Sequence, residues 1–187
     1  MNPIIHRDRQ ALLPASLALP PAGLPQIRPL APHDAALVGE FLHALSPASR
    51  RRRFHFGVRE FAPELLRRYA LIDPGHEVAL IATVHEGGRT RCVGEARYAA
   101  LEREPDSREF AIAVLDEVQR RGLGTALLEQ LLQHARRAGV RWLQGDVLRD
   151  NKAMLALAGK LGFAVQRHPD DATLVRLIRA TTSRSLQ

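Results

Sequence analysis

The stretch Val114-Leu-Asp-Glu-Val-Gln-Arg-Arg-Gly-Leu-Gly-Thr-Ala-Leu-Leu128 decides how this chain folds. It follows the short apolar run Phe110–Val114, which is typical of a β-strand. Apolar residues then recur at helical spacing and predict a helix over residues 125–138. These residues are Leu127, Leu128, Leu131, Leu132 and Ala135. We therefore expect a strand, a glycine-containing loop and a helix, in that order.

The loop between strand and helix has the chemistry of a phosphate site. The first N–H groups of a helix lack partners and carry partial positive charge, so they bind phosphate oxygens. Gly122 and Gly124 have no Cβ and let a ligand approach the backbone, while Arg120 and Arg121 add permanent charge. The alternative is a helix that needs glycine only for a tight turn. A dinucleotide fingerprint and a Walker A loop are excluded, because their glycine and lysine spacings are absent.

The pattern Gln119-x-x-Gly122-x-Gly124 resembles the acyl-CoA pyrophosphate loop of the GNAT (GCN5-related N-acetyltransferase) superfamily. The likeness extends over about residues 108–167, in the family's strand–loop–helix–strand–helix order. The features that follow the loop are a helix, the stop Gly139, the strand Trp142–Val147, Asn151 and Leu161-Gly-Phe163. The resemblance implies an α/β fold with a mixed sheet of about seven strands flanked by helices. It also implies an N-acetyltransferase that uses acetyl-CoA as acyl donor.

Three more segments resemble one branch of this superfamily, the GNAT domain of bacterial protein lysine acetyltransferases. They are Leu45–Phe54, Glu109–Ala111 and Asp150–Leu155. In that branch the domain is often fused to a larger part, whereas we expect a single domain here. The branch implies a protein lysine as the acceptor. A small amine, such as a polyamine, an aminoglycoside or an amino acid, is the alternative.

Length and composition favour one domain over residues 25–180, with a proline-rich arm at 1–24 and a tail at 181–187. The arm faintly resembles a signal peptide, but Pro14, Pro20 and Pro21 interrupt its apolar run. No run reaches the roughly 20 apolar residues that span a bilayer. The single cysteine, Cys92, excludes an internal disulfide and is expected to be buried and inert. We predict a cytoplasmic protein with no membrane partner.

The net charge of +7 leaves two classes of partner open. A basic cleft binds the phosphates of CoA, and a basic face binds nucleic acid. Aromatic residues make up only 5% of the chain and form no stacking pattern with the arginines, which argues against nucleic acid. A non-catalytic CoA sensor or nucleic-acid adaptor remains the alternative of another class, and a homodimer is compatible with the sequence. The eight histidines show no ligand spacing, so we predict no metal.

Periodicity and turn residues predict the remaining elements. The expected strands are Gln26–Leu30, Glu77–Val84, Arg91–Ala100, Arg108–Val114, Trp142–Val147, Phe163–Arg167 and Thr173–Arg179. The expected helices are Pro32–Leu45, a short helix capped by Ser46, and Pro63–Leu71 with Leu65, Leu66 and Tyr69 inward. Residues 101–107 are polar and predict a loop.

Glu109 is the candidate general base. An amine arrives as ammonium, with a pKa near 10, and must lose a proton before it attacks. The resembling lysine acetyltransferases have a glutamate in this role, and partial burial would raise its pKa. An ion pair with Arg108 or another arginine is the alternative, and Glu95 and His76 are reserve candidates. Strand alternation places Glu109 on the face opposite to Phe110.

The resemblance also assigns the cofactor contacts. In the family the central strand separates from its neighbour, so the N–H groups of Ile112, Ala113 and Val114 become free to polarise the acyl carbonyl. An ordinary paired strand is the alternative. Asn151 would lie near the pantetheine arm, or serve only as a helix cap. The pyrophosphate cradle comprises Gln119, Arg120, Arg121, Gly122, Leu123, Gly124 and Thr125. The alternative for Thr125 is that it is an ordinary residue at the start of the helix.

One position departs from the family. Many members have a tyrosine four residues before the Gly-Phe pair, where it protonates the leaving thiolate. Here that residue is Ala158, which excludes a general acid at this position. Tyr98 could replace it, although nothing in the sequence places it there. The run Arg50–Arg53 is either a solvated helix face or a border of the acceptor cleft that contacts an acidic surface or the CoA 3′-phosphate.

Overall fold

The computed structural model describes residues 24–55 and 61–181 of the chain, so the predictions for the arm and nearly all of the tail lie outside the described residues. The strands are β1 (Gln26–Pro29), β2 (Glu77–Glu86), β3 (Arg89–Leu101), β4 (Glu104–Val114), β5 (Trp142–Leu148), β6 (Ala164–Arg167) and β7 (Leu174–Ala180). The helices are α1 (Ala35–Ala44), α2 (Pro47–Phe54), α3 (Pro63–Ala70), α4 (Leu123–Arg137) and α5 (Lys152–Lys160). Two short 3₁₀ helices, η1 (Pro32–Asp34) and η2 (Asp116–Val118), complete the fold.

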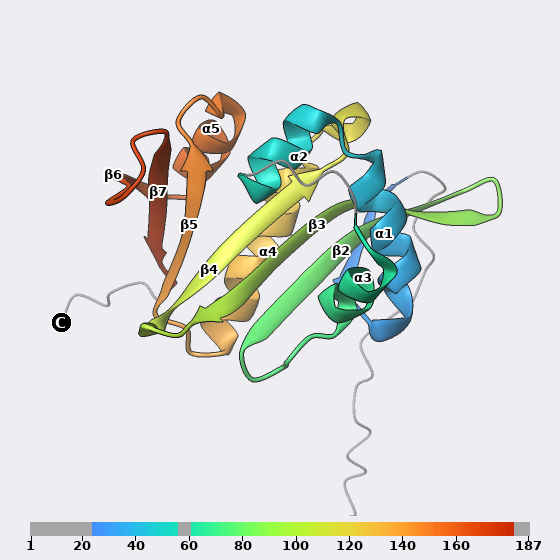
Figure 1. Ribbon diagram of the computed structural model, residues 1–187, viewed down its shortest axis with the longest axis horizontal. Helices are drawn as coiled ribbons and strands as arrows, with labels where there is room; N and C mark the ends of the chain where they lie inside the picture. The colour runs from blue at the N-terminus through green and yellow to red at the C-terminus, as the bar shows by residue number, and fades with distance from the viewer. Residues whose placement is uncertain (1–23, 56–60, 182–187) are drawn as a thin grey trace, which may run out of the picture.

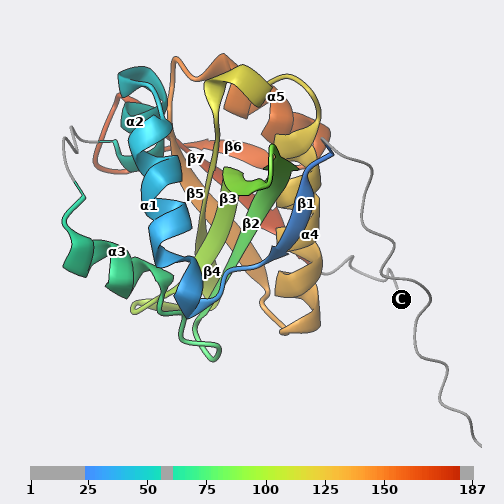
Figure 2. The same ribbon diagram turned by 90° about the vertical axis from the view of Figure 1, so that its right-hand side faces the viewer.

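The seven strands form one mixed sheet in the order β1-β2-β3-β4-β5-β7-β6, which confirms the predicted fold class. Helices α1, α2 and α3 cover one face of the sheet, and α4 and α5 cover the other (Figure 1, Figure 2). Neighbouring strands are antiparallel except for β4 and β5, which are parallel. The two strands are parallel because the predicted loop–helix–strand unit, with α4 as its helix, connects β4 to β5.

The parallel pairing between β4 and β5 is short. It joins residues 107–109 to residues 142–144, after which β4 continues to Val114 and β5 to Leu148 without pairing with each other. Figure 1 shows the two strands diverging toward the end of the molecule where α2 and α5 lie. The sheet is therefore open on one side of β4, beyond Glu109.

Helix α4 lies on the sheet as the leucine spacing predicted. Leu127, Leu128, Leu131, Leu132 and Ala135 are all buried. A Cβ at Gly94 of β3 would lie 3.0 Å from a Leu127 methyl group, so this glycine lets the helix approach the strand closely. Gly139 follows the helix with φ +71°, the left-handed geometry that commonly ends helices.

Helix α2 also forms as predicted. The Ser46 Oγ accepts the N–H of Ser49 at 3.2 Å, and Pro47 occupies the first helical position. The helix ends at His55, whose φ of 61° is left-handed and uncommon for a residue with a side chain.

Two predictions about local structure were wrong. The segment expected to be a loop at residues 101–107 belongs mostly to strands, because Leu101 of β3 pairs with Glu104 of β4. Leu65 was expected to point inward but is 49% exposed, because α3 packs on α1 at the margin of the fold. Its neighbour Leu66 makes that contact, and a Cβ at Gly39 of α1 would lie 2.7 Å from it.

Candidate active site

A cleft of about 410 Å³ lies where β4 and β5 separate, between the C-terminal end of α2 and the sheet. We call it the β4 cleft. Its volume is that of a small-molecule site. The polar residues that line it come from five elements: Arg52 and Arg53 from α2, His55 just after it, Arg97 from β3, Glu109 from β4, Asp146 from β5 and Asn151 at the start of α5. Residues far apart in the sequence therefore meet at this opening.

Glu109 lies on the floor of the β4 cleft, opposite Ala99 of β3. Its side chain is exposed, not partly buried as the sequence analysis expected. It forms no hydrogen bond or ion pair with any residue in the described ranges. The alternative partner, Arg108, instead donates to the carbonyl oxygens of Pro105 and Ser107. The Glu109 carboxylate is thus free to accept a proton from a bound molecule.

The backbone of β4 presents donors to the opening. The Leu115 N–H donates to the Val93 carbonyl at 3.0 Å, so odd-numbered residues of this register bond to β3 and even-numbered ones face away. The N–H groups of Ile112 and Val114 consequently point into the gap left by β5. The same alternation directs the Ala113 N–H toward β3, which differs from the role predicted for that residue.

The loop before α4 leaves six successive N–H groups, at residues 120–125, without a partner among the described residues. Arg120 and Gly122 have left-handed φ angles of 61° and 87°, and α4 begins directly afterwards at Leu123. Left-handed residues in such a turn aim neighbouring N–H groups in one direction, which makes an anion-binding concavity. Nothing lies within 4 Å of the place that a Gly122 Cβ would occupy. The backbone of this loop therefore fits a diphosphate.

Gln119 holds the loop in place through its own donors. Its amide nitrogen donates to the Val114 carbonyl at 2.9 Å and to the Ser49 Oγ at 3.4 Å, and its N–H donates to the Asp116 carbonyl at 3.3 Å. It positions the loop and offers no free donor to a phosphate, unlike the role predicted for it.

Asp116 ties α2 to the same loop. Its carboxylate accepts hydrogen bonds from the hydroxyls of Ser46 and Ser49, at 3.0 and 2.9 Å. Burial favours a higher pKa for Asp116, but these hydrogen bonds outweigh it and hold the pKa below its usual value. The wall of the β4 cleft and the phosphate loop are thereby joined.

Glu95, a reserve candidate for the base, is fully buried beneath the cleft. It accepts hydrogen bonds from Tyr69 Oη at 2.7 Å and Arg97 Nε at 2.6 Å, and Arg53 Nη2 lies 3.8 Å away. Burial opposes ionisation, but the charges of Arg97 and Arg53 and these hydrogen bonds keep the pKa of Glu95 below its usual value. Glu95 is therefore an ionised structural group that a substrate does not reach.

The other reserve residues lie away from the β4 cleft. His76 is exposed in the turn before β2 and pairs with Asp73 at 2.9 Å. Tyr98 pairs with Phe110, so it lies on the α4 face of the sheet, where it is buried. Ala158 is fully buried in α5. None of these residues lines the cleft.

Three polar residues of the cleft, Arg97, His55 and Asp146, were not predicted from the sequence. His55 is partly buried, and burial lowers its pKa, so the imidazole is neutral at pH 7. Asp146 accepts two hydrogen bonds from Arg176 at 2.8 and 2.9 Å and one from His168 at 3.0 Å. Burial alone would raise the pKa of Asp146, but the hydrogen bonds and charges of Arg176 and His168 outweigh it and lower the pKa. None of the three positions stands in a recognisable motif, so only the fold reveals them.

Asn151 and Thr125 are the remaining predicted site residues, and each has a side-chain donor that is available to a ligand. Asn151 Oδ1 accepts the Met154 N–H at 3.3 Å, which confirms the helix cap. Its amide nitrogen and the Thr125 hydroxyl bond to no residue that the structure describes.

Cys92 is buried as expected, and burial raises its pKa to about 12. The described ranges contain no group of three or more side chains able to hold a metal ion, and none of their helices is long and apolar enough to cross a membrane.

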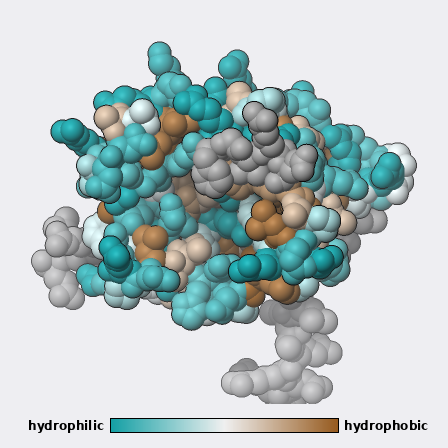
Figure 3. All heavy atoms as spheres, in the orientation of Figure 1, coloured by the Kyte–Doolittle hydropathy of each residue, from teal (hydrophilic) through white to brown (hydrophobic). Residues whose placement is uncertain are grey.

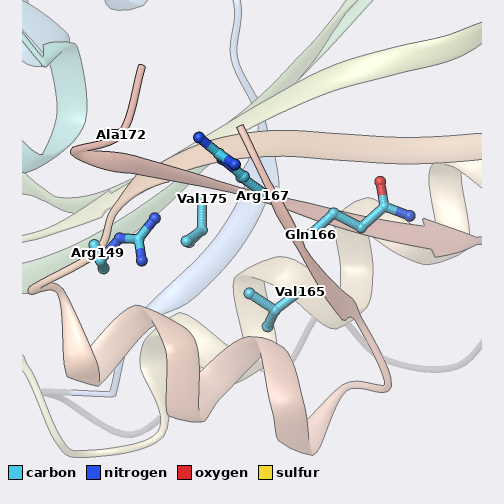
Figure 4. Close-up of a pocket in the computed structure, with 6 residues that line it drawn as sticks. All are labelled: Arg149, Val165, Gln166, Arg167, Ala172 and Val175. Atoms are coloured by element: carbon cyan, nitrogen blue, oxygen red, sulfur yellow. The ribbon is translucent and has the colours of Figure 1, made fainter. Parts of the chain in front are cut away.

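Two other hollows lie elsewhere on the molecule. One, of about 490 Å³, lies at the β6 edge of the sheet, where Val175 lies between the side chains of Arg149 and Arg167 (Figure 4). The other, of about 680 Å³, borders Arg121 and Gly122 on the side of β1 to β3. Neither of these two hollows is lined by Glu109.

An open parallel strand pair beside a loop of unpaired amides is the arrangement of an acyl-CoA-binding fold. The profile of the Acetyltransferase (GNAT) family matches residues 42–163. The chain belongs to this family and is an acetyl-CoA-dependent N-acetyltransferase.

Known proteins agree with this assignment. An acetyltransferase of Pseudomonas aeruginosa is 40% identical over 149 residues, which cover 80% of each chain. The crystal structure of the GNAT domain of S. lividans Pat is 26% identical, covers 83% of this chain and 90% of that chain, and has a TM-score of 0.76. The structure of yncA from Salmonella typhimurium, solved with its cofactor acetyl-CoA, covers 87% and 96% at 19% identity with a TM-score of 0.68 and supports the fold.

Proposed function

We propose that the protein transfers the acetyl group of acetyl-CoA to the side-chain amine of a protein lysine, and that Glu109 is the general base. The observation that carries this proposal is the free carboxylate of Glu109 beside the opening of the sheet. The sequence resemblance to protein lysine acetyltransferases and the structural likeness to the S. lividans Pat domain support a lysine as the acceptor.

The donor would be held by backbone groups. The unpaired N–H groups of residues 120–125 would bind the pyrophosphate, with Arg120 and Arg121 adding charge. The N–H groups of Ile112 and Val114 would polarise the acyl carbonyl, since preset donors stabilise charge where it develops. The Asn151 amide nitrogen would bind the pantetheine arm.

Glu109 would accept one proton from the lysine ammonium. The neutral amine then attacks the carbonyl carbon, a C–N bond forms, the C–S bond breaks and CoA leaves as its thiolate. The second proton passes from the nitrogen to the CoA thiolate through solvent as the amide forms, so CoA is released as the thiol. A thiolate is a fairly good leaving group, so the alanine at position 158 does not prevent direct transfer.

Glu109→Gln tests the base. Turnover at neutral pH should fall about 100-fold or more, while the Kd for acetyl-CoA changes little, because the substitution removes only a proton acceptor. Glu129→Gln, on the exposed surface of α4, is the matched control and should behave like the wild type. Unchanged turnover in Glu109→Gln would show that the base lies elsewhere.

The acceptor is tested by incubating a lysate with the enzyme and isotope-labelled acetyl-CoA, followed by mass spectrometry. Label on the lysine side chains of proteins is the expected result. Label confined to small amines would refute the protein acceptor while leaving acetyl transfer intact.

A further inference from the structure

The four consecutive arginines of α2 have different surroundings. Arg50 donates to the carbonyl oxygens of His43 and Leu45, and Arg53 points inward and donates to Tyr69 Oη at 2.8 Å. Arg51 and Arg52 are exposed, and of these two only Arg52 lines the β4 cleft. Arg52 forms no hydrogen bond or ion pair within residues 24–55 and 61–181. Its charge is therefore available to a molecule in the cleft.

The other charges around the cleft are already matched. Arg97 pairs with Glu95 at 2.6 Å, and Asp146 pairs with Arg176 at 2.8 Å. Arg53 lies 3.8 Å from Glu95 and is only 10% exposed. His55 is neutral at pH 7, because burial lowers its pKa.

The two cleft charges that lack a described partner have opposite signs. Glu109 lies on the floor, and Arg52 lies on the α2 wall. Both ends of this wall are held in place, because Asp116 binds Ser46 and Ser49 at its start, and Tyr69 binds Arg53 near its end. Hydrophilic side chains cover much of the described surface seen in Figure 3, and hydrophobic areas lie between them. The apolar lining residues have no preference between charged acceptors, so Glu109 and Arg52 are the groups that can distinguish them by charge.

We infer that Arg52 selects acceptors that carry a carboxylate close to the reactive amine, which for a protein means a lysine with an acidic neighbour. The inference rests on the proposed function for the protein acceptor. The ammonium would lie at Glu109, while the neighbouring carboxylate would pair with the Arg52 guanidinium. A polycationic amine would instead place a second positive charge near Arg52, which disfavours it.

Three peptides of one sequence test this inference. The central lysine is flanked by acidic residues, by their amides, or by basic residues, and thiol release gives kcat/KM for each peptide. The wild type should favour the acidic peptide over the amide peptide by about two- to fivefold, the range of one exposed charge pair. Arg52→Gln should remove this difference, and Arg52→Glu should reverse it. Arg51→Gln, an exposed neighbour outside the cleft, is the matched control and should keep the wild-type order.

A small-molecule pair separates this inference from the proposed function. The wild type should acetylate 6-aminohexanoate faster than hexylamine, and Arg52→Gln should abolish that preference. If the peptides are not acetylated but this preference holds, the protein acceptor is wrong and the role of Arg52 stands. Equal rates within both substrate sets in the wild type, or a preference that persists in Arg52→Gln, would overturn the role of Arg52. A wild type that acetylates neither set would overturn both.

Discussion

Replacing Glu95 by glutamine should destabilise the protein more than any exposed charge substitution. The carboxylate is fully buried and receives a hydrogen bond from Tyr69 at 2.7 Å and an ion pair from Arg97 at 2.6 Å. Arg53 lies within 3.8 Å of it. Glutamine has nearly the same size, so the change removes the negative charge without leaving a cavity.

The magnitude follows from the charges left behind. Arg97 and Arg53 are 16% and 10% exposed, so both guanidinium groups would lose their buried counter-ion. Removing one partner of a buried ion pair typically costs about 3–5 kcal/mol. That is a large part of the roughly 5–15 kcal/mol by which folded proteins are stable. We expect the free energy of unfolding to fall by about 3 kcal/mol or more at pH 7.

The pH dependence has a definite sign. The pKa of Glu95 is lowered in the folded protein, so the ionised carboxylate stabilises the fold at pH values above the unfolded pKa of about 4.3. This contribution is lost as the pH falls from there through the lower folded pKa. The gap between wild type and Glu95→Gln should thus be constant between pH 6 and 8 and narrow in acid.

Urea unfolding followed by circular dichroism measures both effects. With a slope near 2 kcal/mol per molar urea, the midpoint should fall by about 1.5 M. Glu64→Gln is the control, because Glu64 makes an exposed ion pair with Arg67 at 2.6 Å and should leave the midpoint unchanged. A Glu95→Gln midpoint equal to that of the wild type at pH 7, or a gap that widens in acid, would refute the reasoning.

Two glycines provide further predictions. Gly122→Ala forces a side chain onto a residue with φ 87° and should raise the Kd for acetyl-CoA about tenfold in calorimetry. Gly88→Ala, at φ 76° in the hairpin tip, adds similar strain away from the loop and should leave that Kd unchanged; equal effects would contradict a phosphate role for the loop. Gly145→Ala places a Cβ 2.8 Å from the Phe110 carbonyl oxygen and should reduce the free energy of unfolding by about 1–3 kcal/mol in urea. Gly159→Ala in α5 meets no atom within 4 Å and should not destabilise; a stable Gly145→Ala would show that β5 can move away from β4.

Much of the fold follows from local patterns along the chain. The leucine spacing of α4 and the Ser46 cap of α2 are local signals, and the structure confirms both. The start of β4 was missed because Glu-Pro-Asp-Ser at residues 104–107 is polar and contains a proline, which favours a loop. Pairing with β3 and β5 overrides that preference.

The β4 cleft could be predicted only in part. Glu109 and the loop at residues 119–125 stand in recognisable motifs, but Arg52, His55 and Asp146 come from elements that meet only after folding. The four arginines of α2 were indistinguishable in the sequence. They become distinct because each points in a different direction around one short helix, toward carbonyl oxygens, solvent, the cleft or Tyr69.

Gln119 is another residue whose role is visible only in the folded structure. A glutamine before a glycine loop looks like a ligand residue, yet its amide bonds to the end of β4 and to Ser49 of α2. Asp116 makes the neighbouring connection to Ser46 and Ser49. The bonds to Ser46 and Ser49 join residues about 70 positions apart, and no periodicity within either segment encodes them. These contacts join the loop at residues 119–125 to the α2 wall of the β4 cleft, which carries Arg52.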